Sequence, residues 1–411
     1  MSVRLKGFPK QVNILTLLEY LLMLLVLLYS SMWTLFVPAK SNEFLRLSYP
    51  LLAVMIVLRL RAIRAPRMQR LILVTVLLAV FLLFTRYNVA RYALYYVVPI
   101  LLLMLYIGLC DEKSAAFGLL YKLTDIVVVL AAVSLFCYVF GTCLGILPGA
   151  RETTYFWASE TRTCTTYFHL YYEAQTADIF GLHLVRNCGI FTEAPGFAVF
   201  LIYALAVEVF LRQRPRVWRL FLLCAAVLTT YSTKAILLAV AVFGLQYLIT
   251  TPRTVLWRRF KMVVIPAVCL AVAAVAVILL KDKMNTDSFY IRLDDLFASL
   301  KAWRTSPLFG TGYYNDDSVI AQFAYPRPNN GLSMGLPVLL AQGGLFLVGL
   351  YVGAAVACTL RLRGYARRQM ASFFVTYFVL MFVSNIPFSF LAMLLLAFSL
   401  EGVRCERDFA A

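Results

Sequence analysis

One short segment of the chain, Arg186 to Gly196, combines a cation, a carboxylate and a turn. It reads Arg-Asn-Cys-Gly-Ile-Phe-Thr-Glu-Ala-Pro-Gly, in which Glu193 is the carboxylate, and it stands where a long polar stretch meets an apolar one. A guanidinium clamps phosphate oxygens, and a carboxylate at a half-buried boundary has a raised proton affinity unless a cation lies beside it. These residue types predict a site for a charged substrate that carries an apolar tail.

The elements that must position this segment are membrane helices. Of the 411 residues, 62% are hydrophobic and 14% are charged, and the mean hydropathy is +0.83. No soluble core is large enough to hide that apolar surface. Backbone groups in hydrocarbon need internal partners, and the alternation of barrel strands is absent from the sequence. We therefore expect an all-α, polytopic membrane protein that forms a single transmembrane domain over residues 1–411.

A hydropathy window predicts about twelve spans. They lie at Ile14–Val37, Phe44–Leu58, Leu71–Thr85, Ala93–Cys110, Thr124–Ile146, Ala194–Leu211, Leu220–Tyr231, Ala235–Thr250, Met262–Leu280, Leu336–Leu360, Ala371–Ser384 and Phe388–Leu400. Several are short. The two short legs around Lys234 fit either a spanning hairpin or a re-entrant pair.

Basic residues set the expected orientation. Arg4, Lys6 and Lys10 lead the chain, and clusters follow at Arg59–Arg70, Arg212–Arg219, Arg253–Lys261 and Arg361–Arg368. With twelve spans these clusters share one side, which the positive-inside rule makes cytoplasmic, together with both termini. Lys234 then lies at the outer tip of its hairpin.

Two polar segments, 147–193 and 281–335, are predicted to lie outside, where long loops usually carry function. The inner loops leave no room for a nucleotide-binding domain, and no Gly-rich loop followed by Lys-Ser or Lys-Thr is present, which argues against ATP-driven transport. The net charge of +18 lies in short clusters at membrane loops. It indicates topology determinants and contacts with membrane lipids rather than nucleic-acid binding.

Basic side chains outside these clusters need a reason, because the outer side normally avoids them. The candidates on the outer face are Arg186, Lys234, Arg292, Lys301, Arg304 and Arg327. The carboxylate of Glu193 lies among these cations in the sequence. A phosphate-bearing ligand supplies a reason, since guanidinium groups bind phosphate oxygens and offset the charge of a leaving diphosphate. The alternative is that some of these cations only pair with Glu160, Glu173, Asp294 or Asp295. Glu193 itself has three candidate roles: general base, acceptor for a sugar hydroxyl, or support for an arginine.

The second outer segment contains an amphipathic pattern from Asp287 to Arg304. Its apolar residues are Phe289, Leu293, Leu296, Phe297, Leu300 and Trp303. This spacing predicts a helix at the membrane surface, which either forms one wall of the route taken by a lipid-linked substrate or is only a packing lid. The acidic pairs Asp294-Asp295 and Asp316-Asp317 are more typical of solvated surfaces than of metal sites.

Cysteine and histidine are sparse among the outer segments. Cys164 and Cys188 share the first one, where a disulfide is one of two open alternatives. With only His169 and His183 in the chain, no zinc site is predicted.

Four stretches resemble the O-antigen polymerase and ligase superfamily, and among its members most closely the Wzy-type polymerases of capsule, exopolysaccharide or O-antigen. They are Arg186 with Gly-Ile-Phe-Thr-Glu-Ala-Pro-Gly; Tyr-Ser-Thr-Lys234 at the head of a span; Arg292 with Trp303 and Ser-Pro-Leu-Phe-Gly-Thr-Gly; and Gln-Gly-Gly-Leu from Gln342. The resemblance covers most of residues 180–400.

The resemblance implies a GT-C-like membrane glycosyltransferase of the bacterial cytoplasmic membrane that works without metal, nucleotide sugar or other cofactor. Donor and acceptor would both be glycans linked to undecaprenyl pyrophosphate, and chain-length regulator and flippase proteins would be partners. Arg186, Lys234 and Arg292 would bind pyrophosphate, and Glu193 would position or deprotonate the acceptor, with Arg186 and Glu193 as the catalytic residues. We also predict Arg304, Arg327, Tyr313 and Asn330 as substrate-binding residues.

One departure from the family pattern separates the alternatives. Ligases and many polymerases carry a His-Asn pair before the helix of Gln342, whereas this chain reads Pro-Asn-Asn-Gly-Leu-Ser from Pro328. A ligase that depends on that histidine is disfavoured. A transporter or flippase is the non-enzyme alternative, but the chain shows no convincing internal repeat.

Overall fold

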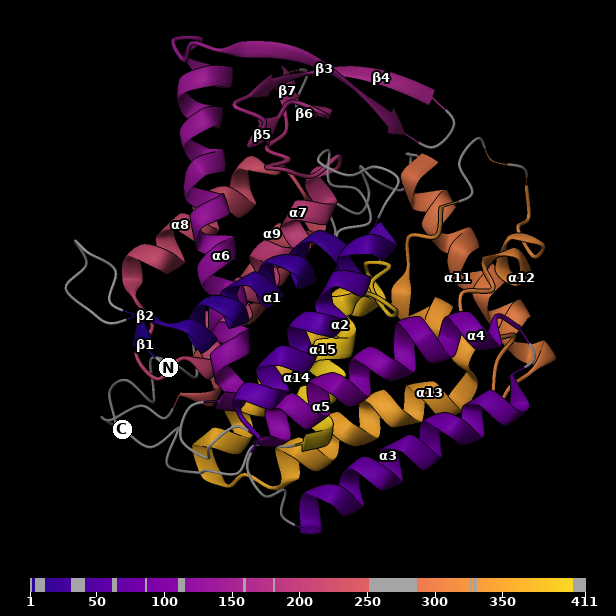
Figure 1. Ribbon diagram of the computed structural model, residues 1–411. Coiled ribbons are helices and arrows are strands. Elements are labelled where there is room, and N and C mark those ends of the chain that lie inside the picture. The colour runs from indigo at the N-terminus through magenta and orange to yellow at the C-terminus, as the bar shows by residue number, and fades with distance from the viewer. Residues whose placement is uncertain are drawn as a thin grey trace, which may run out of the picture.

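The computed structural model describes residues 2–3, 12–30, 41–60, 65–85, 87–109, 115–157, 160–179, 182–250, 287–325, 327 and 331–401. Within these ranges the fold is mostly helical (Figure 1). The helices are α1 Ile14–Ser30, α2 Ser41–Leu58, α3 Ala65–Phe84, α4 Val89–Tyr92, the π-helix η1 Ala93–Val97, α5 Val98–Leu109, α6 Ala115–Cys137, the π-helix η2 Tyr138–Cys143, α7 Ala194–Ala206, the π-helix η3 Val207–Leu211, α8 Val217–Thr229, α9 Thr233–Ile249, α11 Asp287–Thr305, α12 Asp316–Ile320, α13 Gly335–Leu360, α14 Gly364–Phe382 and α15 Phe390–Glu401.

These helices follow the predicted apolar spans. Every predicted span overlaps a helix except Met262–Leu280, which lies outside the described residues, as do Arg253–Lys261. By length and composition, four helical stretches of the described chain can cross a membrane, namely Val89–Leu109, Phe117–Cys143, Ala194–Leu211 and Gly335–Leu360. Shorter apolar helices accompany them, among them both legs of the hairpin around Lys234.

The expectation of an all-α fold was wrong for the first long polar segment. It forms β3 Ala150–Trp157, β4 Glu160–Tyr167, β5 Tyr171–Tyr172, β6 Thr176–Ile179 and β7 Leu182–Val185, and near the N-terminus β1 Ser2–Val3 pairs with β2 Val12–Asn13. Strand order is β3-β4-β5 and β6-β7, all antiparallel. The physical reason is composition: Thr and Tyr recur along 150–172, and these side chains favour extended backbone. Figure 1 shows these strands over one end of α6 and α7.

The helix that follows Glu193 forms the centre of the bundle. From Phe197 to Leu211, which covers most of α7 and all of η3, every residue is buried, and α6, α8, α9 and α14 contact this helix. A helix that is apolar on all sides belongs inside a bundle. Glu193 is therefore fixed at the end of the least mobile kind of element, because its helix is enclosed by neighbours.

Three of the predicted basic clusters meet at the other end of the bundle. Arg59 pairs with Glu19, near the start of α1, at 3.1 Å. Arg70 and Arg361 both donate to the carbonyl oxygen of Glu401, at 2.8 and 3.4 Å. The start of α3 and the ends of α2, α13 and α15 therefore lie together.

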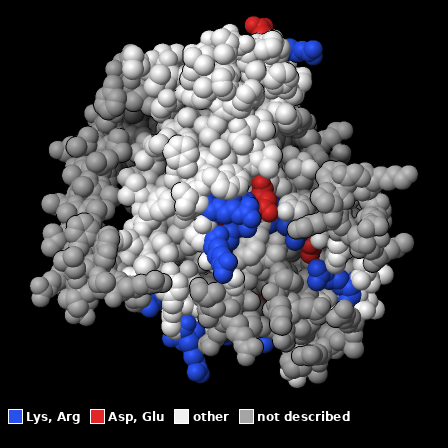
Figure 2. Space-filling view, turned by 90° about the vertical axis from the view of Figure 1, so that its left-hand side faces the viewer, with Lys and Arg blue, Asp and Glu red and all other residues white. Residues whose placement is uncertain are grey.

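The cluster 212–219 joins the same end through α6. Lys122 of α6 lies 3.0 Å from Glu19, and one turn later Asp125 binds Arg212 at 3.1 Å and also Arg219. Since α7 and η3 run from Glu193 to Leu211, Glu193 lies at the opposite end. Figure 2 shows the consequence on one face, where Lys and Arg gather in the lower half and most of the upper part is uncharged.

Two sequence motifs of the second half, Ser-Pro-Leu-Phe-Gly-Thr-Gly from Ser306 and Gln-Gly-Gly-Leu from Gln342, contact each other through backbone hydrogen bonds. α13 breaks at Gly344, whose φ is 61°, and the Pro-Leu-Phe-Gly loop lies in this break. Leu345 N donates to Pro307 O at 2.9 Å, and Gly312 N donates to Gln342 O at 3.0 Å. A side chain at Gly344 would place its Cβ 2.3 Å from the carbonyl oxygen of Leu308. Only glycine allows the two backbones to approach this closely.

Replacing Gly344 with Ala should therefore destabilise the protein by at least about 2 kcal/mol, because both the left-handed backbone and the clash oppose a Cβ. The measurement is thermal unfolding of the purified full-length protein in detergent. Gly349→Ala in the same helix is the matched control, because a Cβ there meets nothing within 4 Å. Equal stability of both variants would contradict the close backbone contact at Gly344.

Candidate functional site

The predicted charges around Glu193 converge in the structure. Glu193 immediately precedes α7, Lys234 lies in the first turn of α9, Arg186 follows β7, and Arg292 projects from α11. Burial raises the pKa of Glu193 above its ordinary value, and Lys234, Arg186 and Arg292, in that order, oppose the shift. Three segments far apart in sequence, the loop 186–193, α9 and α11, thus supply one carboxylate and three cations to one place, which we call the Glu193 cluster.

The carboxylate of Glu193 is not engaged in a capping hydrogen bond or a close ion pair within the described chain. Its side chain is partly exposed and makes no capping hydrogen bond to α7. Within the described chain, no cation approaches its oxygens within the 4.0 Å of an ion pair. The three cations act on it electrostatically rather than through a direct ion pair. The N-terminus of α7 adds its positive end to the same place.

Arg186 is held from one side. Its Nε donates to Thr230 O at 2.9 Å and its Nη1 to Gln175 Oε1 at a longer 3.4 Å. The same Gln175 oxygen accepts from Ala194 N at 3.1 Å, which ties the arginine to the start of α7. The remaining N–H groups of Arg186 have no partner in the described part of the chain. They are the edge that can grip phosphate oxygens.

Lys234 and Arg292 reach the cluster from different directions. Lys234 Nζ donates to Ser384 Oγ at 2.9 Å and to Val383 O at 3.3 Å, beyond the end of α14. Arg292 has a pKa lowered by burial, an effect countered by Asp295 and Glu193. The cluster therefore joins α7, α9, α11 and α14.

Asn187 is a positioning residue that the sequence analysis missed. It is fully buried. Its Nδ2 donates to Thr229 Oγ1 at 3.0 Å and to Ser134 Oγ at 3.2 Å, and its Oδ1 accepts from Gly189 N at 3.1 Å. It thereby fastens the loop of Arg186 to α6 and α8. The Asn-Cys-Gly order, with an Asn two residues before a Gly, was the available signal, because Asn side chains hydrogen-bond backbone two residues ahead.

Asn187→Ala should lower the free energy of unfolding by about 2–3 kcal/mol, because it leaves buried partners unsatisfied. Ser134→Ala, which removes one of the three partners, should cost only about 1 kcal/mol. Thermal unfolding in detergent measures both. A Ser134 variant as damaging as the Asn187 variant would show that the asparagine does not organise this loop.

Other predicted site residues lie elsewhere. Arg327 is occupied by the carboxylates of α11, with Nη1 2.7 Å from Asp295 Oδ1 and Nη2 2.5 Å from Asp294 Oδ2. Asp295 also accepts from Ser333 N at 2.8 Å. These contacts fasten α11 to the stretch before α13, and the role of Arg327 in substrate binding stays a prediction.

Arg304 and Tyr313 also lie outside the Glu193 cluster. Arg304 is exposed in the last turn of α11, where a cation favours the helix terminus. Tyr313 is 1% exposed and packs against the rings of Tyr92 and Phe388. Asn330 lies outside the described residues.

The predicted amphipathic helix exists. Of its predicted apolar residues, Leu293 and Phe297 are exposed, and the other four, Phe289, Leu296, Leu300 and Trp303, are partly buried. Tyr290, Leu293 and Phe297 are 54%, 39% and 52% exposed. The buried face of α11 carries instead Asp294, Asp295, Ala298, Ser299 and Ala302, and it packs against α13. Small residues allow this close packing, and Arg327 neutralises the acids.

Metal and thiol chemistry find little support among the described residues. No group of three or more His, Cys, Asp or Glu side chains there is arranged to hold a metal ion. Cys164 and Cys188 are buried free thiols, and burial raises the pKa of Cys188 to about 12.

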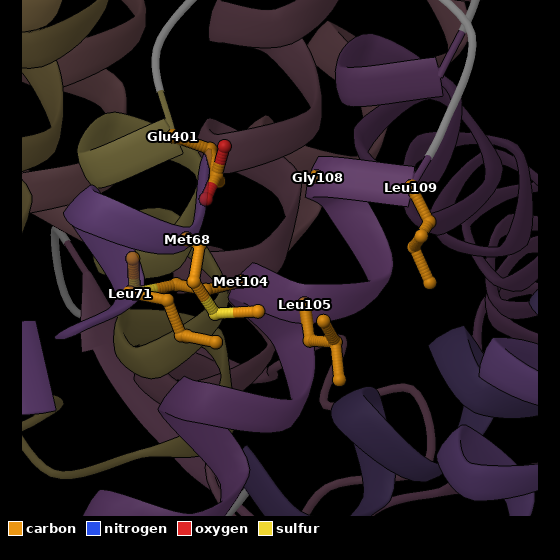
Figure 3. Close-up of a pocket in the computed structure, with 7 residues that line it drawn as sticks. All are labelled: Met68, Leu71, Met104, Leu105, Gly108, Leu109 and Glu401. Atoms are coloured by element: carbon orange, nitrogen blue, oxygen red, sulfur yellow. The ribbon is translucent and has the colours of Figure 1, made fainter. Parts of the chain in front are cut away.

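An apolar pocket lies at the end of the bundle away from Glu193. Met68, Leu71, Met104, Leu105, Gly108, Leu109 and Glu401 line this small pocket (Figure 3). Its lining includes one carboxylate, that of Glu401, and no cation.

Comparison with known proteins identifies the second half of the chain. Residues 218–351, about a third of the chain, match the family model described as O-antigen ligase. This stretch contains Lys234, Arg292 and the two glycine motifs that begin at Ser306 and Gln342, but not Arg186 or Glu193. No curated protein and no solved structure matches the chain. The match is confined to residues 218–351, and through this stretch the membrane protein is similar to the O-antigen polymerase and ligase superfamily.

Proposed function

We propose that the protein is a Wzy-type polymerase that joins oligosaccharide repeat units carried on undecaprenyl pyrophosphate. The observation that carries this proposal is the Glu193 cluster, in which Arg186 from the same loop, Lys234 from α9 and Arg292 from α11 act on one carboxylate. The family match over residues 218–351 supports enzymatic glycan transfer and gives no support to a flippase. Two needs of the reaction, neutralising a leaving diphosphate and orienting an acceptor hydroxyl, match the two kinds of charge.

The transfer requires one bond to form and one to break at the anomeric carbon of the donor. The acceptor hydroxyl oxygen bonds to this carbon while the bond from carbon to diphosphate oxygen breaks. The hydroxyl proton passes to Glu193, and undecaprenyl pyrophosphate leaves with the electron pair. Arg186, Lys234 and Arg292 offset the charge that builds up on the diphosphate. Glu193 suits the role of base because burial raises its pKa.

The lipid tail would lie along α11. Arg292 of this helix directly precedes the exposed Leu293. A diphosphate bound by Arg292 therefore leaves its attached chain next to apolar side chains. We further propose twelve spans of GT-C type, a place in the bacterial cytoplasmic membrane, and the Glu193 end facing outward, because the basic clusters share the other end.

Glu193→Gln and Arg186→Ala should abolish long glycan chains and leave single repeat units on the acceptor. The expected loss of rate is at least about 100-fold, the size seen when a charged group of this kind is removed. Arg186→Lys keeps the charge without the fork and should retain part of the activity. Gel profiles of glycan from cells expressing each variant measure chain length.

Arg151→Ala is the matched control, because Arg151 is an exposed cation on β3 and is not among the cations that act on Glu193. Normal chain length in both site variants would refute the polymerase. A second candidate is the ligase, which the description of the matched family favours. For a ligase, the variants would accumulate full-length polymer on the carrier lipid instead of single units.

The pH profile tests Glu193 as the base. Activity requires the carboxylate, so it should fall as pH drops through the raised pKa of Glu193. Arg292 lowers this pKa. Arg292→Gln should therefore raise the pKa further and move the acid limb of the rate profile to higher pH. Polymerisation by the protein in lipid vesicles measures the limb, with Arg151→Gln as control. A limb that stays in place or moves to lower pH would exclude Glu193 as the titrating group.

A further inference from the structure

A second group of aromatic and charged side chains lies at the Glu193 end of the bundle. It consists of Tyr29, Tyr49, Arg91, Tyr314 and Asp316, which we call the tyrosine cluster. Tyr29 interacts electrostatically with Tyr314, Tyr49 and Arg91. The guanidinium carbon of Arg91 lies 4.9 Å from the ring centroid of Tyr314, and Arg91 also acts on Asp316. Segments α1, α2 and α4 and the turn before α12 thus converge.

No hydrogen bond or ion pair within the described chain accounts for the presence of Arg91. Its side chain is exposed. All of its N–H donors are available while its guanidinium plane lies over a ring. Only one carboxylate oxygen of Asp316 is hydrogen-bonded: it accepts from Gln342 Nε2 at 2.7 Å. The other oxygen has no hydrogen-bond partner among the described residues.

The backbone of Tyr314 adopts an energetically unfavourable conformation. Its φ is 56°, in the left-handed region that a bulky residue rarely adopts. Such a conformation persists where the surroundings over-determine it. Here the rings of Tyr313 and Phe388 flank Tyr314 with centroids at 5.3 and 5.7 Å. The fold therefore fixes this ring beside Arg91 rather than leaving it to move.

A short stretch of chain connects this cluster to the Glu193 cluster. Ser384 accepts from Lys234 at 2.9 Å, and Phe388 packs on Tyr314. Four residues of backbone span at most about 14 Å. A sugar chain whose neighbouring unit reacts beside Lys234 can therefore reach Tyr314.

We propose that the tyrosine cluster binds a sugar ring of the acceptor oligosaccharide. This inference rests on the proposed function. Sugar hydroxyls both donate and accept hydrogen bonds, and the cluster offers a guanidinium, a carboxyl group and phenols. The ring of Tyr314 and the plane of Arg91 suit the apolar face of a pyranose. A second diphosphate fits less well, because the carboxyl group of Asp316 stands beside the cation.

Binding of a lipid-free glycan tests the proposal directly. The probe is the host's own repeat-unit oligosaccharide, released from its lipid and diphosphate, added to full-length protein in lipid nanodiscs. Calorimetry should show a Kd raised at least about tenfold, equal to 1.4 kcal/mol, in Arg91→Gln and in Tyr314→Asn. Asn is chosen because it tolerates the left-handed backbone. Arg151→Gln should bind as the wild type does, and Tyr314→Phe should change the Kd by less than about threefold, since it keeps the ring.

Undecaprenyl pyrophosphate is the second probe and separates the possible failures. Unchanged binding of this lipid by Arg91→Gln and Tyr314→Asn shows that these variants are folded. If the glycan binds the wild type and both variants equally, the tyrosine cluster is not its site, while the proposed polymerase stands. If the wild type binds neither probe, the proposed function fails, and this inference fails with it. Loss of lipid binding and not of glycan binding in the variants would assign the cluster to diphosphate and overturn the proposal.

Discussion

A carboxylate at the end of the most buried of the four candidate membrane spans is the constraint on which the candidate site depends. Removing Glu193 from water favours its neutral form, and only nearby cations offset that cost. The helix α7 itself has no cation next to Glu193, so the positive charge comes from Arg186 in the preceding loop, Lys234 of α9 and Arg292 of α11. The site therefore depends on how these elements are held together.

Each of those cations needs its own support, and the supports extend through the fold. Thr230 and Gln175 hold Arg186, and the end of α14 holds Lys234. Arg292 depends on α11, whose acidic face is clamped by Arg327 to the stretch before α13. Arg327 thus serves the site from outside it: its ion pairs orient the helix that carries Arg292.

At the opposite end of the bundle the charges are reversed: acidic side chains neutralise basic ones. There the basic residues are numerous, and acids compensate them: the buried Glu19 pairs with Arg59 and Lys122, and the half-buried Asp125 pairs with Arg212 and Arg219. Between the two charged ends the helices are apolar. The break in α13 is accommodated in this apolar region because the Pro-Leu-Phe-Gly loop takes over its freed backbone groups. Both motifs had appeared unrelated in the sequence.

The sequence by itself determined the helices, because the hydrocarbon requirement makes every long apolar run helical whatever its neighbours are. It also singled out Arg186, Glu193, Lys234 and Arg292, since charges at membrane boundaries are costly enough to stand out. It did not predict the strands of 150–185, where Thr and Tyr preferences act without a hydropathy signal. Nor did it predict which face of α11 is buried: Arg327, more than thirty residues away, pairs with Asp294 and Asp295, and this acidic face is the buried one. Only tertiary structure decides such matters, because the partner that neutralises a charge or fills a turn comes from elsewhere in the chain. Asn187 and the tyrosine cluster are further cases, since each becomes meaningful only when separate helices bring its partners together.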